Sequence, residues 1–226
     1  MPRRDELHGL ARSVKQHVDS LRLLGVKEMS LGPRAPATAS SRLTALAELD
    51  RLVKRCTKCP LYQTATRHVF GEGDPHAKLL FVGEAPARDE DLQGRPFVGR
   101  AGQLLTKMIE AMGLKREDVY ICNVIKHRPS QNRLPEPQEM EACKPYLVEQ
   151  LAILQPTVIC TLGAVAGRAL LGPTIAIMKT RGRFHEFDGI PLMPTLHPAY
   201  LLRNPDAKKL VWQDLKKVKT LLQEHA

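Results

Sequence analysis

The chain has 226 residues, 43% of them apolar, which suits one large α/β domain or a domain with an extension. Its 34 Lys and Arg outnumber its 24 Asp and Glu, so the formal charge is +10 and the favoured partner is a polyanion such as nucleic acid. No stretch approaches the ~18 uninterrupted apolar residues of a membrane span, and no apolar signal-peptide core is present. A membrane protein is therefore excluded, and the cytoplasm is the expected location.

The first part of the chain differs from the rest in composition. Residues 5–25 repeat apolar side chains at helical spacing, and the segment 32–41, "GPRAPATASS", is rich in Pro, Ala and Ser. We therefore expect residues 1–41 to form a helical extension with a flexible linker. Residues 42–226 are expected to form the main domain, which starts with a helix over 42–55.

Five cysteines, an odd number, indicate metal ligands or buried thiols in a reducing compartment. Cys56 and Cys59 form a Cys-x-x-Cys pair ahead of the first expected strand, whereas a thioredoxin-like redox pair would follow a strand. With Cys143 and Cys160 they make a four-thiolate set for zinc or an iron–sulfur cluster, and the wide second spacing favours [4Fe–4S]. The alternative that only the first pair binds a metal stays open. Cys122 is expected to be a buried thiol within a strand.

Four short apolar runs alternate with helical patterns after the Cys-x-x-Cys pair. The expected strands are 78–83, 119–124, 157–163 and 190–195, and the expected helices are 101–113, 137–154 and 163–171. This alternation predicts an α/β fold with parallel strands, right-handed crossovers and a sheet covered on both faces. Pro145 is expected to kink or split the helix that contains it.

A polar or glycine-rich loop follows each of the four expected strands. In chain order these loops contain "GEAPARDED", "KHRPSQNR" directly after the second strand, "GAVAG" and "HPAYLLRNP". Ligands of open parallel sheets bind at the carboxyl ends of the strands. The sequence therefore predicts a single active cleft at that end of the sheet.

Five motifs occur in a fixed order: "CTKC", "GEAPARDEDLQGRPFVGRAGQLL", "YICNVIKHRPSQNRLPEPQEMEAC", "VIC" and "HPAYLLRNP". Together they resemble the family 4 uracil-DNA glycosylases, the iron–sulfur branch of that superfamily, over residues 52–222. The resemblance implies a three-layer α/β/α fold with a four-stranded parallel central sheet. It also implies a structural [4Fe–4S] cluster held by Cys56, Cys59, Cys143 and Cys160. The implied enzyme is a monofunctional, monomeric hydrolase that removes uracil from single- or double-stranded DNA to start base excision repair.

The resemblance also assigns residues to the pocket. Asn123 resembles the amide that donates to uracil O4 and accepts from N3–H, a pattern that cytosine reverses. Phe97 resembles the aromatic floor on which the base stacks. His197 resembles the donor to uracil O2, where negative charge builds during cleavage. Gly83 and Ala85 are expected to line the pocket beside them.

Glu84 and Glu90 are the expected candidates for positioning water or stabilising the sugar cation. Related glycosylases use an Asp at the place where this chain carries Ala85, so another acid must supply that function. A carboxylate just after a strand can equally cap the next helix, and that alternative stays open for Glu90.

Two further groups of residues are expected to contact DNA. The loop that fills the gap left by the extruded base contains Leu201, Leu202 and Arg203. Phosphate contacts are expected among Arg95, Arg100, Lys126, Arg128, Arg133 and Arg181, of which about half are expected to be ordinary surface residues.

Two other functions stay open from sequence alone. Ala85 supports a protein that binds uracil or abasic sites without turnover, and zinc binding would support a nucleic-acid-binding protein with no base chemistry. The chain lacks the basic, His-containing insert of relatives that trap DNA covalently, so turnover is expected.

Overall fold

The computed structural model describes residues 39–225, so the expected helix at 5–25 and most of the expected linker lie outside the described residues. The elements are α2 (Ala39–Lys54), η1 (Pro60–Gln63), β1 (Glu72–Gly73), β2 (Leu79–Gly83), α3 (Arg88–Gln93), α4 (Arg100–Ala111), η2 (Arg116–Asp118), β3 (Tyr120–Asn123), η3 (Ser130–Asn132), α5 (Pro137–Leu154), β4 (Val158–Leu162), α6 (Ala164–Leu171), α7 (Ile177–Thr180), β5 (His185–Phe187), β6 (Ile190–Thr195), α8 (Pro198–Arg203), η4 (Pro205–Ala207) and α9 (Lys208–Glu224). The helix α2 starts three residues before the expected boundary at residue 42.

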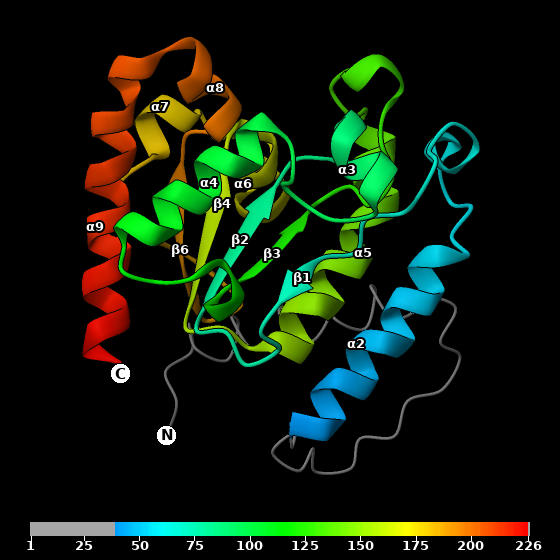
Figure 1. The fold of residues 1–226 in the computed structure, drawn as a ribbon, viewed down its shortest axis with the longest axis horizontal. Helices are drawn as coiled ribbons and strands as arrows, with labels where there is room; N and C mark the ends of the chain where they lie inside the picture. The colour runs from blue at the N-terminus through cyan, green and yellow to red at the C-terminus, as the bar shows by residue number, and fades with distance from the viewer. Residues whose placement is uncertain (1–38, 226) are drawn as a thin grey trace.

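The central sheet has the strand order β1-β3-β2-β4-β6-β5 (Figure 1). Its four middle strands are parallel, as expected, and each ends toward the same edge. The two outer strands, β1 and β5, pair antiparallel with β3 and β6. They were missed because strands of two and three residues carry no readable periodicity.

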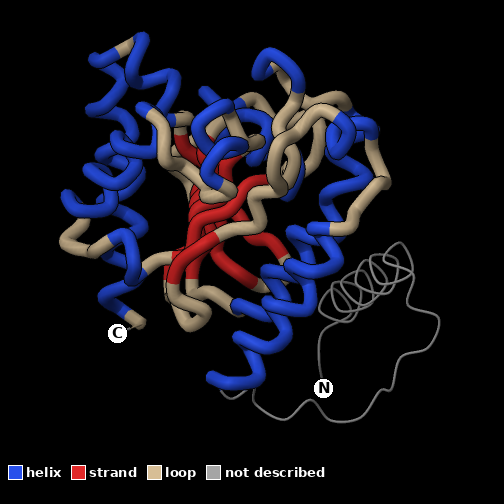
Figure 2. The backbone as a smooth tube through the Cα atoms, turned by 45° about the vertical axis from the view of Figure 1, so that its right-hand side comes forward, coloured by secondary structure: helices blue, strands red, loops and turns tan. Residues whose placement is uncertain are grey.

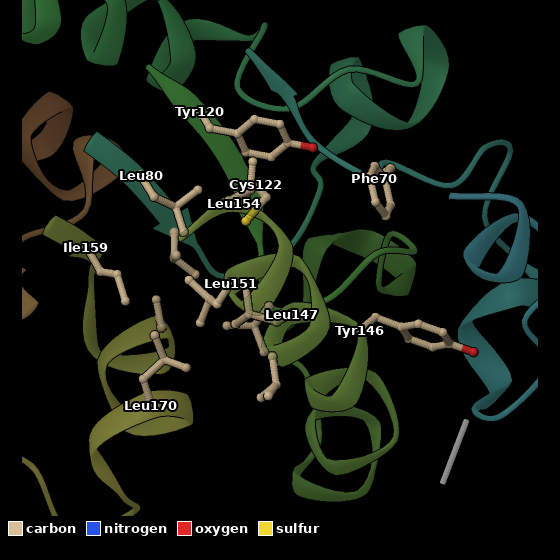
Figure 3. Close-up of a cluster of buried hydrophobic side chains, with 14 of the residues drawn as sticks. Phe70, Leu80, Tyr120, Cys122, Tyr146, Leu147, Leu151, Leu154, Ile159 and Leu170 are labelled. Carbon is tan, nitrogen blue, oxygen red and sulfur yellow. The ribbon is translucent and has the colours of Figure 1, made fainter. Parts of the chain in front are cut away.

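Helices cover both faces of the sheet, which confirms the three-layer α/β/α arrangement (Figure 2). Side chains alternate along each strand, so Leu80 and Val82 enter one hydrophobic cluster while Leu79 and Phe81 enter the other. The first cluster, partly drawn in Figure 3, packs under α5 and α6, and α2 lies against α5. The second cluster packs under α4 and α9. Within residues 39–225, the helices are each too short or too polar to cross a bilayer.

The helix α5 runs without a break through Pro145, so the expectation of a split there is wrong. Proline removes one intrahelical hydrogen bond and crowds the preceding turn. Here the helix buries Cys143, Leu147 and Leu151 against the sheet, and this packing outweighs the local cost.

Candidate active site

Gly83 and Asn123 end two neighbouring parallel strands and are paired in register. Asn123 is only 2% exposed, and within the described part of the chain its Oδ1 has no hydrogen-bond partner. A Cβ atom on Gly83 would overlap both this oxygen and the ring of Phe97. Glycine therefore leaves space between an unpaired acceptor and an aromatic ring. A buried amide of this kind costs free energy unless a partner reaches it.

Phe97 supplies that ring from the loop before α4. Its φ is +51°, a left-handed conformation that costs a non-glycine residue about 1–3 kcal/mol. The backbone carbonyl of Phe97 lies so close to Gly102 that a Cβ there would overlap it. The strained conformation therefore needs support from neighbouring groups.

Glu90 supplies one such support. It is 7% exposed, and its Oε1 accepts hydrogen bonds from the backbone N–H groups of Val98 and Gly99, both at 2.9 Å. Its Oε2 accepts from the N–H of Ala87 at 3.1 Å. The carboxylate therefore fixes the two residues that follow Phe97. Both oxygens of Glu90 are occupied by these backbone hydrogen bonds. The prediction that Glu90 acts on water stays a prediction.

Arg116 supports the other side of the same loop. Its Nη2 donates to the carbonyl of Pro96 at 2.6 Å and to Glu72 Oε1 at 2.7 Å. Arg95 also pairs with Glu72, at 2.7 Å. Sequence reasoning missed Arg116 and Glu72, because neither belongs to a motif and only the fold brings β1 next to this loop.

His197 caps the N-terminus of α8. Its Nδ1 accepts a hydrogen bond from the N–H of Ala199 at 3.1 Å, so the proton of the neutral ring lies on Nε2. Burial, helped by the charge of Arg203, lowers the pKa of His197 to about 4. The ring stacks against Phe97 with centroids 5.6 Å apart and planes 30° apart. The structure therefore holds a neutral imidazole beside the aromatic ring, with Nε2–H as its donor.

Glu84 directly follows Gly83 and is half-buried. Burial raises the pKa of its carboxyl group, and within residues 39–225 that carboxyl has no hydrogen-bond or ion-pair partner. Its backbone is held in place, since its carbonyl accepts from Ile125 N–H at 3.0 Å. Ala85, the next residue, packs against the first hydrophobic cluster. Of the two candidate acids, Glu84 is the one whose carboxylate is available to a ligand.

Asn123, Phe97 and His197 thus gather at the carboxyl end of the sheet, although they come from three separate segments of the chain. A sequence model of the Uracil DNA glycosylase superfamily matches residues 70–216, a range that includes all three. This chain belongs to that superfamily. The match confirms the resemblance read from the sequence motifs.

Named relatives of this superfamily member cover most of its length. The Type-4 uracil-DNA glycosylase of Thermotoga maritima is 46% identical over 176 residues, which are 76% of this chain and 92% of the relative. The Type-4 uracil-DNA glycosylase of Archaeoglobus fulgidus is 41% identical over 184 residues, or 78% and 92% of the two chains. The Type-5 uracil-DNA glycosylase of Pyrobaculum aerophilum is 32% identical over 185 residues, or 71% and 81%.

The segment expected to fill the gap in DNA forms α8 of this glycosylase-superfamily domain. Leu201 is 1% exposed and belongs to the second hydrophobic cluster, so its assignment to the minor groove is wrong. Leu202 is 38% exposed, and Arg203 is also on the surface. A helix turns successive residues through about 100°, which buries one leucine and exposes the next. Leu202 and Arg203 remain predictions for the wedge.

Two of the cations expected to contact phosphate are bound by groups of the protein itself instead. Lys126 has no exposed surface, and its Nζ donates to the carbonyls of Phe70 at 3.1 Å and Asn123 at 2.8 Å and to Gln150 Oε1 at 2.5 Å. The expectation of a phosphate contact is therefore wrong for Lys126. The lysine instead holds the backbone of the base-reading candidate Asn123.

Arg181 is the second cation that the structure removes from the expected DNA surface. It pairs with Asp214 at 2.6 Å, and Thr195 donates to the same carboxylate at 2.5 Å. Asp214 is 1% exposed and lies on α9. These contacts tie α9 to the end of β6, two residues before His197, so Arg181 has a structural role.

Three of the four expected metal ligands lie on one face of the sheet. Cys56 follows α2, Cys59 precedes η1, and both pack against the first hydrophobic cluster, which contains Cys143. Burial raises the pKa of the Cys143 thiol to about 12, and the nearby Cys59 and Cys56 act in the same direction. All five cysteines are free thiols.

Cys160 lies on the opposite face, so the expected four-cysteine set does not fit one cluster. On β4, Ile159 enters the first hydrophobic cluster and Cys160 enters the second, because alternate residues of a strand point to opposite faces. In residues 39–225, no three His, Cys, Asp or Glu side chains already surround a metal-sized point. The expectation that Cys160 is a ligand is therefore wrong.

Proposed function

We propose that this protein is a uracil-DNA glycosylase that hydrolyses the N-glycosidic bond of deoxyuridine in DNA and so starts base excision repair. Type-4 uracil-DNA glycosylases with 41–46% identity support this activity. The observation that carries the proposal is the Oδ1 of buried Asn123, which lies beside the ring of Phe97 and has no hydrogen-bond partner among residues 39–225. The substrate is single- or double-stranded DNA, which the net charge of +10 attracts.

Base recognition follows from the groups around the pocket. The target nucleotide leaves the stack, because its glycosidic bond is otherwise shielded. Uracil stacks on Phe97 while Asn123 Oδ1 accepts from N3–H and Asn123 Nδ2 donates to O4. Cytosine presents an acceptor at N3 and a donor at C4, so a fixed amide leaves two unmatched pairs and rejects it.

Cleavage needs stabilisation at both ends of the breaking bond. The electrons of the C1′–N1 bond leave with uracil, whose O2 becomes negative, and the sugar becomes an oxocarbenium-like cation. The Nε2–H of neutral His197 donates to O2, and a fixed donor of this type contributes about 10²–10³ to the rate. The Glu84 carboxylate stabilises the cation and orients the water that adds to C1′, and the proton that this water loses neutralises the departing uracil anion. Glu90 fixes the loop that carries Phe97.

A [4Fe–4S] cluster is proposed as a structural group near the Cys-x-x-Cys pair. Cys56, Cys59 and Cys143 fit this role, because they share one face of the sheet. The cluster joins the segment after α2 to α5, and no step of the cleavage passes through it. The five free thiols are favoured by a reducing compartment such as the cytoplasm, where we propose that the protein acts as a monomer.

The test is release of uracil from a single-uracil oligonucleotide, measured together with binding of the same oligonucleotide. Asn123→Ala and His197→Ala are expected to lose at least about 100-fold in single-turnover rate, while binding changes little. Asn132→Ala and His76→Ala, exposed residues of the same types, serve as matched controls. A wild-type protein that binds uracil-containing DNA but releases no uracil would instead be a binding protein without turnover.

A further inference from the structure

The proposed cluster lacks a fourth protein ligand once Cys160 is excluded. The backbone of the sheet separates Cys160 from Cys56, Cys59 and Cys143, and its neighbours are Leu162 and Met193 of the second hydrophobic cluster. No rotation about the Cys160 side chain moves the thiol to the other face. The missing ligand must come from the face that carries α5.

Cys122 is on that face but lies in the wrong place. In Figure 3 it sits beneath Tyr120 and next to Leu154, away from Tyr146, which is one turn after Cys143 on α5. Its Cβ is the close neighbour of Gly71, at 3.0 Å from the position of a Cβ on that glycine. Cys122 is therefore packed within the first hydrophobic cluster, against the sheet, and not beside Cys143.

His127 is a metal-binding side chain next in sequence to a residue that contacts Cys143. The backbone N–H of Lys126 donates to Cys143 Sγ at 3.3 Å. Standard backbone dimensions then place the Cα atom of the next residue, His127, no more than about 8.5 Å from that sulfur. The imidazole covers about half of this distance, and a cluster bound between the two residues would cover the rest. His127 is 8% exposed, and its side chain lines a cavity of about 730 Å³ whose wall also contains Cys56 and Thr57.

The charges around this cavity favour an anionic occupant. Lys54, Arg55 and Arg67 line it, and the acid in its wall, Asp50, already pairs with His68 at 2.8 Å. A [4Fe–4S] cluster held by three thiolates and a neutral imidazole carries net negative charge. Basic side chains at its rim offset the cost of placing that charge in a partly buried site.

We propose that His127, and not Cys160, is the fourth ligand, so that Cys56, Cys59, Cys143 and His127 hold the cluster. The inference rests on the proposed cofactor and not on the uracil chemistry. The side chains of these four residues move together around the cluster when it binds. Cys160 is a buried core thiol with no part in metal binding.

The test compares His127→Ala, His127→Cys, Cys160→Ala and Cys143→Ala in the full-length protein purified without oxygen. Iron, zinc and sulfide per chain, visible absorbance and electron paramagnetic resonance are measured, with uracil release recorded separately. We expect Cys160→Ala to keep the wild-type iron content, and His127→Ala to lose at least half of it, as Cys143→Ala does. His127→Cys is expected to restore the iron and to lower the reduction potential, because a thiolate replaces a neutral imidazole.

Several outcomes overturn the assignment. One is iron loss in Cys160→Ala with full iron in His127→Ala. Another is a His127→Ala protein whose iron content, spectra and potential equal those of the wild type. A wild-type protein with neither iron nor zinc overturns the site as a whole, while its uracil release still tests the proposed activity. Iron without uracil release refutes the activity alone.

Discussion

Replacing Glu90 with Gln tests whether this acid positions Phe97 or acts on water. The carboxylate accepts three backbone hydrogen bonds, from Val98 and Gly99 at 2.9 Å and from Ala87 at 3.1 Å. An amide has one oxygen, so at least one N–H faces an NH₂ group and the other bonds lose their charge. Bonds to charged groups contribute about 1.5–3 kcal/mol and neutral ones about 0.5–1.5 kcal/mol, which gives a loss of about 3–5 kcal/mol.

This loss is measurable as thermal stability. For a domain of this size each kcal/mol moves Tm by about 2–4 °C, so E90Q is expected to melt about 10 °C below the wild type. Asp89→Asn is the matched control, because it removes an exposed acid from the same first turn of α3. It is expected to change Tm by less than about 2 °C.

Activity of E90Q separates the two roles. If Glu90 holds Phe97 in its left-handed conformation, the loosened loop weakens binding of the base, so KM rises and kcat at saturating DNA falls less. Free uracil is also expected to inhibit E90Q more weakly than the wild type. A Tm equal to that of the wild type, with kcat reduced at saturating DNA, would refute the positioning role and restore the prediction that Glu90 acts on water.

The remaining predictions concern His197, α8 and Gly83. The pKa of His197 is about 4 in the folded protein and 6.5 in the unfolded chain, so the folded state loses stability as the pH falls from 6.5 toward 4, by up to about 3 kcal/mol. Thermal melting temperatures of the wild type and His197→Asn should therefore converge over that pH range. Parallel pH profiles of the two proteins would contradict the lowered pKa. Leu201→Ala is expected to lose about 2–5 kcal/mol of stability, measured by urea unfolding. Leu202→Ala should keep its stability but lose more uracil release from double-stranded than from single-stranded DNA. Equal losses on both substrates would exclude Leu202 as the wedge. Gly83→Ala should reduce uracil release at least about 10-fold with a stability loss of about 1–3 kcal/mol, because the added Cβ would overlap Asn123 and Phe97. A rate of uracil release equal to that of the wild type would show that the pocket does not use this space.

The sheet and its candidate active edge were readable because each parallel strand is an apolar run followed by a polar or glycine-rich segment. That pattern located Asn123 at the end of β3 and His197 just after β6, and the structure brings both to Phe97. The strain at Phe97 was not readable. It depends on Glu90, Gly102 and Arg116, which meet only in the folded protein.

The wrong face for Cys160 has a different cause. A strand with one solvent-exposed face alternates apolar and polar residues, so its sequence shows which side chains lie on the same face of the sheet. All five residues of β4 are buried, and "VICTL" carries no such contrast. The sequence therefore placed Cys160 on a strand but did not show which face of the sheet it points to. Its spacing and the family resemblance then grouped it with cysteines that lie across the sheet.

Lys126 shows why charge alone misleads at a buried site. A lysine in a basic loop is usually a surface residue, yet here three neutral oxygens surround its Nζ, and burial lowers its pKa. Its N–H contacts Cys143 while its Nζ contacts the carbonyl of Asn123. One residue thus joins Cys143 to the backbone of Asn123, the candidate base-reading residue. The proposed metal site and the proposed pocket are therefore connected through Lys126, even though no step of the proposed cleavage needs an electron or a metal ligand.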